Sequence, residues 1–208
     1  MQYSPEREIN TSQTSAEFEL VAISTLFPVD HGLSPELPGG AANAFFARGQ
    51  DRSLRLLTAQ HVVTQGYGDI LSPITGTREG RILFSQNGAD AAWSEVFEAE
   101  VSALPLYYEA LQVGQRLQAQ GLRHIGHRQF KPFTIDTIYK GQTVDDGKTV
   151  HQALIVTGQP QPGDSGSPLI ITHDSSGHLI EPKVVGVLRG VSQEHEGMML
   201  LFSGFWME

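Results

Sequence analysis

The sequence has 208 residues, no cysteine and a formal net charge of −9. That charge argues against nucleic acid or an anionic membrane as the main partner, because both attract basic surfaces. The missing cysteines exclude a scaffold built on disulfides and favour a reducing compartment. Because Met1 to Ala16 contains no apolar run long enough for a signal peptide or a membrane span, we expect a soluble, cytoplasmic protein.

Short apolar segments separated by turn residues fill the first half of the chain. With 22 glycines, 11 prolines and few helical patterns, this spacing is typical of β-barrels or sandwiches. We expect residues 1–16 to form a flexible tail and residues 17–101 to form an N-terminal β-barrel. The clearest strand candidates in this barrel are Glu17–Leu26, Asn43–Arg48, Leu54–Thr58 and Arg81–Gln86.

The second half repeats this alternation of apolar segments and turns. We expect residues 102–115 to form a strap that joins the two barrels, and residues 116–208 to form a C-terminal β-barrel. The turn residues of Thr143–Lys148 predict a hairpin tip. Strands are predicted at 116–122, 130–140, 151–157, 167–173, 183–189 and 198–205. Six strands after the strap and about six before it favour an all-β double barrel.

A serine-containing turn, Gly163-Asp164-Ser165-Gly166-Ser167-Pro168, precedes an apolar run that predicts a buried strand. Its glycines permit backbone dihedrals that a side chain would forbid. A tight turn here can expose the serine hydroxyl and direct the N–H groups of Gly163 and Ser165 at one point, as in an oxyanion hole. The alternative is an ordinary Gly/Ser turn between strands. The whole hexapeptide, however, resembles the nucleophile loop of trypsin-like (chymotrypsin-fold) serine proteases.

Two upstream segments carry the same resemblance. Thr58-Ala59-Gln60-His61-Val62-Val63 resembles the catalytic-histidine segment of that family, and Asp90-Ala91-Ala92 resembles its Asp-x-Ala segment. The separation of 29 residues (90 − 61) is compatible with compact bacterial and HtrA-like members, although we expect no PDZ domain here. A structural histidine and a turn-closing Asp90 are the alternatives. Asp69 is a rival for the aspartate.

The resemblance implies a fold and a mechanism. The fold would be two six-stranded antiparallel Greek-key barrels with the active site between them. His61 would be the general base, Asp90 would orient it, and Ser165 would be the nucleophile of a serine endopeptidase that forms an acyl-enzyme. Gly163 and Ser165 would supply the oxyanion-hole N–H groups. We expect a peptide or protein substrate and neither a cofactor nor a metal.

The sequence also departs from the family pattern. It lacks the Ile-Val-Gly-Gly segment whose new terminus pairs with the aspartate before the serine, so Asp164 must be held in another way. The resemblance assigns Gln159, Leu188, Arg189 and Val191 to the substrate pocket. Gln159 is uncharged, which does not support a preference for lysine or arginine substrates. The strand position that is usually small falls on Leu188 or Arg189.

Other interpretations stay open at this point. His124 and His127 could ligate a metal, although no carboxylate or cysteine partner is nearby. Ser165, Asp174 and His195 occur in the order that α/β-hydrolases use, but the elbow motif and the strand–helix alternation are missing. A protease fold could also be a non-catalytic peptide-binding module, or a latent enzyme controlled by a regulatory partner or a larger assembly.

Overall fold

The computed structural model describes residues 20–24, 41–63, 67–71, 78–83, 85–86, 90–95, 102–126 and 129–204. The described residues form strands and one short 3₁₀ helix, η2 (Gln60–Val62). The strands of the first half are β1 (Leu20–Ser24), β2 (Ala41–Arg48), β3 (Leu54–Ala59), β4 (Tyr67–Leu71), β5 (Arg78–Leu83), β6 (Ser85–Gln86), β7 (Ala91–Glu95) and β8 (Leu104–Pro105). The strands of the second half are β9 (Arg116–Gly126), β10 (Gln129–Asp145), β11 (Lys148–Thr157), β12 (Pro168–His173), β13 (Leu179–Glu194) and β14 (Gly197–Gly204). The predicted tail, 1–16, lies outside the described residues.

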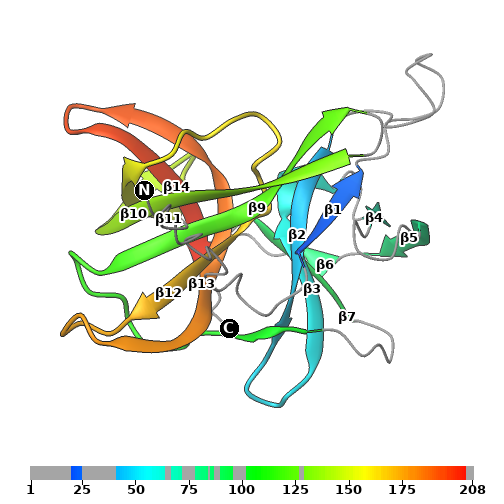
Figure 1. Cartoon of the computed structure of the whole chain (residues 1–208), viewed down its shortest axis with the longest axis horizontal. Helices are drawn as coiled ribbons and strands as arrows, with labels where there is room; N and C mark the ends of the chain where they lie inside the picture. Colours follow the sequence, from blue (N-terminus) through cyan, green and yellow to red (C-terminus); the bar gives the residue numbers. More distant parts are fainter. Residues whose placement is uncertain are drawn as a thin grey trace, which may run out of the picture.

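These strands form two bodies that lie side by side (Figure 1). The first is a sheet with the strand order β5-β4-β1-β2-β3-β7-β6, in which β8 pairs in parallel with β2. The second is a closed barrel of six antiparallel strands, in the order β10-β11-β14-β13-β12-β9. The predicted all-β double-barrel architecture is therefore confirmed. The predicted limits of the tail, barrels and strap stay a prediction.

Strand β12 explains why an uninterrupted apolar run follows the serine-containing turn. Leu169, Ile170 and Ile171 are all fully buried. Because successive side chains of a strand point to opposite faces, Leu169 and Ile171 pack into the core of the second barrel, whereas Ile170 packs into the core of the first sheet. Each such side chain contributes about 1.5–3 kcal/mol on burial. Both cores therefore fix the strand that begins directly after Ser165.

The segment that joins the two bodies contains Leu106 and Tyr107, and it is hydrogen-bonded to both bodies. Leu106 N–H donates to the carbonyl of Arg48 in β2 (3.0 Å), and Tyr107 N–H donates to the carbonyl of Val184 in β13 (2.8 Å). Leu104 and Leu106 are buried in the same cluster as Val184. This segment runs along the base of the molecule in Figure 1, and its contacts fix the relative position of the sheet and the barrel.

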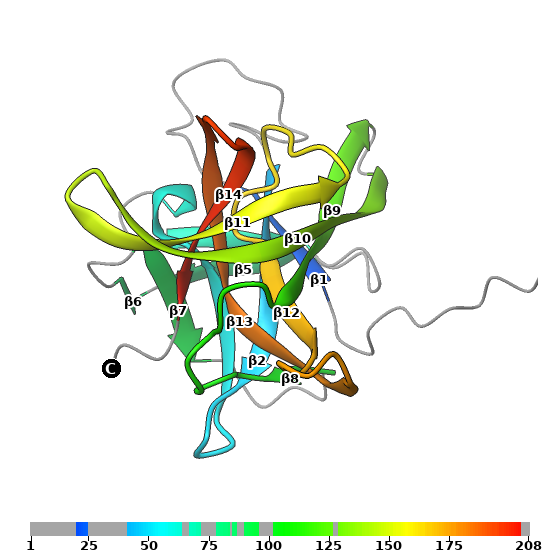
Figure 2. The same cartoon turned by 90° about the vertical axis from the view of Figure 1, so that its left-hand side faces the viewer.

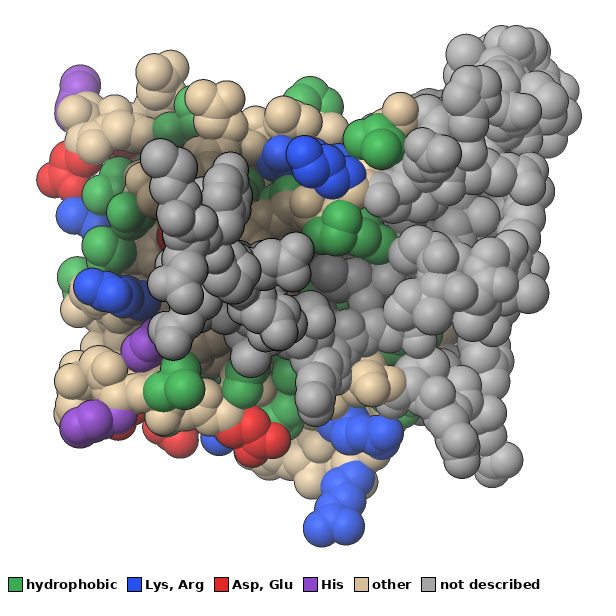
Figure 3. Space-filling view, in the orientation of Figure 1, with side chains coloured by type: hydrophobic (Ala, Val, Ile, Leu, Met, Phe, Trp, Pro, Cys, Tyr) green, Lys and Arg blue, Asp and Glu red, His purple; other side chains and the backbone are tan. Residues whose placement is uncertain are grey.

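The described residues contain no helix that is both long enough and apolar enough to cross a membrane. Acidic and basic side chains lie interspersed on the face of the second barrel that Figure 3 shows, with apolar side chains between them.

The core of the second barrel contains a buried histidine. His151 on β11 is 3% exposed, and its Nδ1 lies 2.8 Å from the hydroxyl of Tyr139 on β10. Its ring stacks on Phe202 of β14, with ring centroids 5.1 Å apart. Burial raises the pKa of Tyr139, so the phenol keeps its proton and can donate it to His151. Burial lowers the pKa of His151 to about 4, so its imidazole is neutral in the folded protein at pH 7.

This neutral histidine makes folding stability depend on pH. An unfolded histidine gains a proton near pH 6.5, whereas His151 in the folded state gains one only near its pKa of about 4. Its contribution is therefore complete above pH 6.5 and is lost as the pH falls from 6.5 to about 4, by roughly 3 kcal/mol in total. We expect the stability that is lost between pH 7.5 and pH 5, measured by denaturant unfolding, to be smaller in His151→Gln than in the wild type. His178→Gln, at an exposed site, is the control; equal losses in wild type and His151→Gln would contradict the prediction.

Candidate active site

The serine-containing turn closes tightly in front of β12. Asp164 N–H donates to the carbonyl of Gln161 (3.1 Å), Pro162 follows Gln161, and Gly163 has a φ of 96°. This is the residue pattern of a type II turn. Among the hydrogen bonds of the described residues, none uses the N–H of Gly163 or of Ser165. Both donors are thus available for an external acceptor, as the oxyanion-hole prediction requires.

Asn43, on β2 of the first sheet, holds this turn from the opposite body. It is fully buried, and its N–H donates to the carbonyl of Ser165 (2.8 Å) while its Nδ2 donates to the carbonyl of Gly163 (2.9 Å). Its Oδ1 accepts the N–H of Leu122 on β9 (2.6 Å), and its carbonyl accepts the Thr58 hydroxyl (2.7 Å). Sequence reasoning missed this residue. The available signal was an asparagine inside an apolar strand, where asparagine is uncommon.

Gly166 lies where the turn touches β2 most closely. A Cβ there would lie 1.9 Å from the carbonyl oxygen of Asn43, and the φ of Gly166 is +84°. Alanine must therefore move backbone as well as adopt a strained dihedral, so we expect Gly166→Ala to cost about 3 kcal/mol or more in unfolding free energy. Gly177→Ala is the matched control, because Gly177 has a φ of +83° with nothing within 4 Å of the added Cβ. Equal losses of unfolding free energy in the two variants, measured by denaturant unfolding, would show that the close approach of residue 166 to the Asn43 carbonyl does not affect stability.

Asp164, the residue before the serine, is paired with an arginine. It is 2% exposed, and Arg123 on β9 contacts both its oxygens, with Nε–Oδ1 2.9 Å and Nη2–Oδ2 2.8 Å. Arg123 also donates to the carbonyl of Gln159 (2.6 Å), and its guanidinium lies 4.2 Å from the ring centroid of Phe133. The hydrogen bond to Asp164 raises the pKa of Arg123. Arg123 is therefore the partner that holds Asp164, which sequence reasoning left unassigned.

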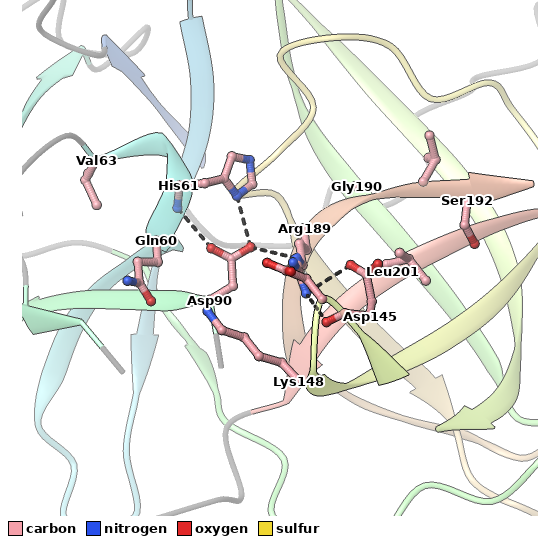
Figure 4. Close-up of a pocket in the computed structure, with 12 residues that line it drawn as sticks. Gln60, His61, Val63, Asp90, Asp145, Lys148, Arg189, Gly190, Ser192 and Leu201 are labelled. Atoms are coloured by element: carbon pink, nitrogen blue, oxygen red, sulfur yellow. Dashed lines mark hydrogen bonds and ion pairs between the residues drawn. The ribbon is translucent and has the colours of Figure 1, made fainter. Parts of the chain in front are cut away.

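The structure brings His61 and Asp90 together at the edge of the first sheet (Figure 4). β3 leads into η2, which carries His61, and Asp90 directly precedes β7, the partner of β3. His61 Nδ1 lies 3.0 Å from Asp90 Oδ2, and the His61 N–H donates to Asp90 Oδ1 (3.0 Å). Asp90 has a φ of 62°, a left-handed conformation that is enriched at functional sites. The imidazole is 47% exposed, so a substrate can reach it.

A third side chain contacts the carboxylate. Arg189 of β13 places Nε 3.1 Å from Asp90 Oδ2 and Nη1 3.1 Å from Asp145 Oδ2 at the end of β10. Burial opposes ionisation of Asp90, but the hydrogen bonds from His61 and the charges of His61 and Arg189 outweigh it and hold its pKa below the ordinary value. Asp90 is therefore an anion at neutral pH, as a group that orients a histidine must be.

The Ser165 hydroxyl has a different partner from the imidazole. It donates to the main-chain carbonyl of Arg189 (3.2 Å), and no hydrogen bond joins it to His61 among the described residues. The carbonyl that holds the hydroxyl and the guanidinium that contacts Asp90 belong to one residue. Rotation about the Cα–Cβ bond of Ser165 is the movement that can redirect its hydroxyl.

Two of the four residues predicted for the substrate pocket line a cavity beside His61, and two do not. A cavity of about 690 Å³ beside His61 is lined in part by Arg189, Gly190 and Val191. Leu188 is 1% exposed and belongs to the core of the second barrel, and Gln159 is exposed on the turn, so neither lines this cavity.

The structure also bears on the alternative site residues. Asp69 lies on β4, which pairs with β1 and β5 and not with β3. Asp174 accepts hydrogen bonds from the N–H groups of Ser176 and His178 and so closes a turn. Ser165 is followed by strand β12, so the described residues around it do not form the strand–helix elbow of an α/β-hydrolase. The side chains of His124 and His127 lie outside the described part of the chain, and the described part holds no group of three histidine or carboxylate side chains that could bind a metal.

Comparisons with known proteins give structural neighbours only. No protein-family model and no curated protein matches the sequence. The Rv3671c protease of M. tuberculosis, in its active form, superposes with a TM-score of 0.61 at 19% identity, over 90% of this chain and 76% of the other. The chain has the chymotrypsin-like protease fold.

Two viral proteases share this fold. The NS6 protease of murine norovirus 1 superposes with a TM-score of 0.55 at 17% identity, over 78% of this chain and 85% of the other. The tobacco etch virus protease complexed with product gives a TM-score of 0.56 at 13% identity, over 100% of this chain and 86% of the other. The neighbours therefore support the protease fold in general and not an HtrA-like protease in particular.

Proposed function

We propose that this protein is a serine endopeptidase with the catalytic residues His61, Asp90 and Ser165. The observation that carries the proposal is the contact between His61 and the buried Asp90, 3.0 Å apart, on a fold shared with proteases. The serine-containing turn adds two N–H donors, those of Gly163 and Ser165, for which the described residues supply no acceptor. An orienting carboxylate, a base, a hydroxyl and an oxyanion-binding pair are the parts that acyl transfer needs.

In the proposed mechanism, Ser165 turns its hydroxyl from the Arg189 carbonyl to His61. His61 Nε2 takes the hydroxyl proton as Oγ attacks the carbonyl carbon of the scissile peptide bond. The N–H groups of Gly163 and Ser165 stabilise the resulting oxyanion, and Asp90 stabilises the imidazolium. His61 then protonates the leaving amine, and the C–N bond breaks. Water hydrolyses the acyl-enzyme by the reverse transfers: His61 takes a proton from the water and returns it to Ser165.

Composition supports a serine over a cysteine nucleophile. Proteases activate either a hydroxyl or a thiol, and the sequence has no cysteine. The same absence suits a reducing compartment, and we propose a cytoplasmic location. The substrate we propose is a peptide or protein that lies along β13 next to Val191, one of the residues that line the cavity beside His61.

A second candidate rests on the orientation of the Ser165 hydroxyl. Because this hydroxyl donates to the Arg189 carbonyl and not to His61, the fold could serve as a latent protease or a non-catalytic peptide-binding module. A latent enzyme would need a partner that redirects the hydroxyl. The two candidates differ in the reactivity of Ser165.

A fluorophosphonate probe tests the proposal on the whole chain. We expect one phosphonate adduct at Ser165, located by mass spectrometry of the digested protein, and much slower labelling in His61→Ala, because the probe needs an activated hydroxyl. Labelling should accompany cleavage in a peptide library. If Ser165 is unlabelled in the native protein, the endopeptidase assignment fails and the binding module is favoured.

A further inference from the structure

Arg189 connects two parts of the molecule that belong to different bodies. Its side chain is 16% exposed and lies between Asp90, at the edge of the first sheet, and Asp145, at the end of the β10–β11 hairpin (Figure 4). Nε contacts Asp90 and Nη1 contacts Asp145, each at 3.1 Å, so one guanidinium bridges two carboxylates. A planar fork with separate donors can do this, whereas the single ammonium of lysine cannot do so with the same geometry.

The β10–β11 hairpin extends away from the barrel toward η2 (Figure 2). Its turn is Asp146-Gly147, where both residues have positive φ (50° and 70°). Asp145, Asp146 and Lys148 from this tip line the same cavity as His61. The tip is therefore a wall of the cavity, and the Arg189–Asp145 ion pair is its charged link to the barrel.

The inner end of this bridge reaches the carboxylate that contacts His61. Asp90 Oδ2 lies 3.0 Å from His61 Nδ1 and 3.1 Å from Arg189 Nε, so the proposed base shares its carboxylate with a permanent cation. The other charged groups on the cavity wall are Asp145, Asp146 and Lys148 of the hairpin tip.

We propose that Arg189 is a positioning residue that ties the tip of the β10–β11 hairpin to Asp90, and that it thereby sets the wall of the cavity beside His61. This inference rests on the proposed function for its meaning in catalysis. The contacts themselves can be tested without substrate turnover, which separates the two proposals.

Three variants of the full chain separate the two roles of Arg189. Arg189→Met removes both ion pairs, Arg189→Lys keeps the charge without the fork, and Asp145→Asn removes only the outer pair. Hydrogen exchange of the amides at 144–148 reports how firmly the tip is held, and the NMR resonance of the proton between His61 Nδ1 and Asp90 reports the effect of Arg189 on that contact. Protection of β9 and β12 in the same exchange experiment reports whether the fold is intact.

We expect tip exchange to rise about threefold to tenfold in all three variants, the effect of losing a partly buried ion pair. The resonance of the proton between His61 Nδ1 and Asp90 should shift in Arg189→Met, because Asp90 Oδ2 loses its second cationic partner. It should stay near the wild-type position in Arg189→Lys and Asp145→Asn, which keep a cation beside Asp90. Tip exchange in Asp145→Asn keeps the test valid if Arg189→Met does not fold.

Unchanged tip exchange in Asp145→Asn and Arg189→Lys would overturn the anchoring role. An unshifted resonance of the proton between His61 and Asp90 in Arg189→Met would overturn the effect on the His61–Asp90 contact. Neither result depends on hydrolysis, so a chain that fails the fluorophosphonate test could still show the bridge, and an active chain could still lack it.

Discussion

Replacing Ser165 with alanine is expected to lower kcat for peptide hydrolysis about 10⁶-fold, the loss seen when a triad member that acts with its partners is removed. The variant keeps the backbone N–H groups of the turn but has no hydroxyl to attack the substrate. Residual hydrolysis would come from the oxyanion hole and from binding alone. Initial rates on a cleaved library peptide, measured under saturating substrate, give the ratio directly.

The control for this experiment is Ser175→Ala, in the exposed turn that follows β12, which should leave kcat unchanged. Because the Arg189 carbonyl is the hydrogen-bond partner of the Ser165 hydroxyl within the described part of the chain, removing this hydroxyl should also leave the unfolding free energy within about 1 kcal/mol of wild type. Hydrolysis at the wild-type rate in folded Ser165→Ala would exclude this residue as the nucleophile.

Arg123→Met should have the second large effect, because it leaves the buried carboxylate of Asp164 without its counter-ion. Breaking a buried pair at one partner costs about 3–5 kcal/mol, and the 23% exposure of Arg123 places our expectation at the lower end. Because Asp164 lies between Gly163 and Ser165, a shift of its carboxylate would displace the proposed oxyanion donors, and kcat should fall about 10²-fold or more. Denaturant unfolding and peptide kinetics measure the two effects.

A double variant isolates the charge as the cause. Arg123→Met with Asp164→Asn removes both charges, so it should recover part of the stability that Arg123→Met loses. Arg116→Met, on the exposed face of the same strand, is the matched control for the loss of an arginine from β9. A double variant that is as unstable as the sum of the two single variants would mean that the ion pair is not what holds Asp164.

Local sequence predicted those parts of the fold that short segments encode. Apolar segments ending in turn residues predicted strands close to β2, β3, β11, β12 and β14. The predicted strand 130–140 was too short, because β10 continues to Asp145. The structure explains the difference by a register shift between Tyr139 and Gly141, where Gly141 has a φ of 116° and lets the strand bend without ending.

Contacts between distant segments could not be predicted from the sequence. The partners in the Asn43–Gly163 hydrogen bond are 120 residues apart, and those in the Arg123–Asp164 pair are 41 apart. No periodicity or motif relates such positions. The packing of the two bodies brings the first pair together, and the pairing of β9 with β12 inside the barrel brings the second pair together. The sequence did indicate that Asp164 needed a new partner and that Leu188 or Arg189 stood where a small residue is usual. The geometry supplies Arg123 for the first and the Asp90–Arg189–Asp145 bridge for the second.

Because β12 is packed into two cores and its preceding turn is held by Asn43 from the first sheet, the position of Ser165 is fixed from both sides only when the two halves of the molecule are docked. If the halves were expressed as separate fragments, each would carry only part of the proposed catalytic groups, and the fragment with Ser165 would lack the contacts from Asn43. Covalent labelling of that serine would then report reassembly of the fragments, so the protein could be divided into a complementation sensor whose signal arises from docking itself.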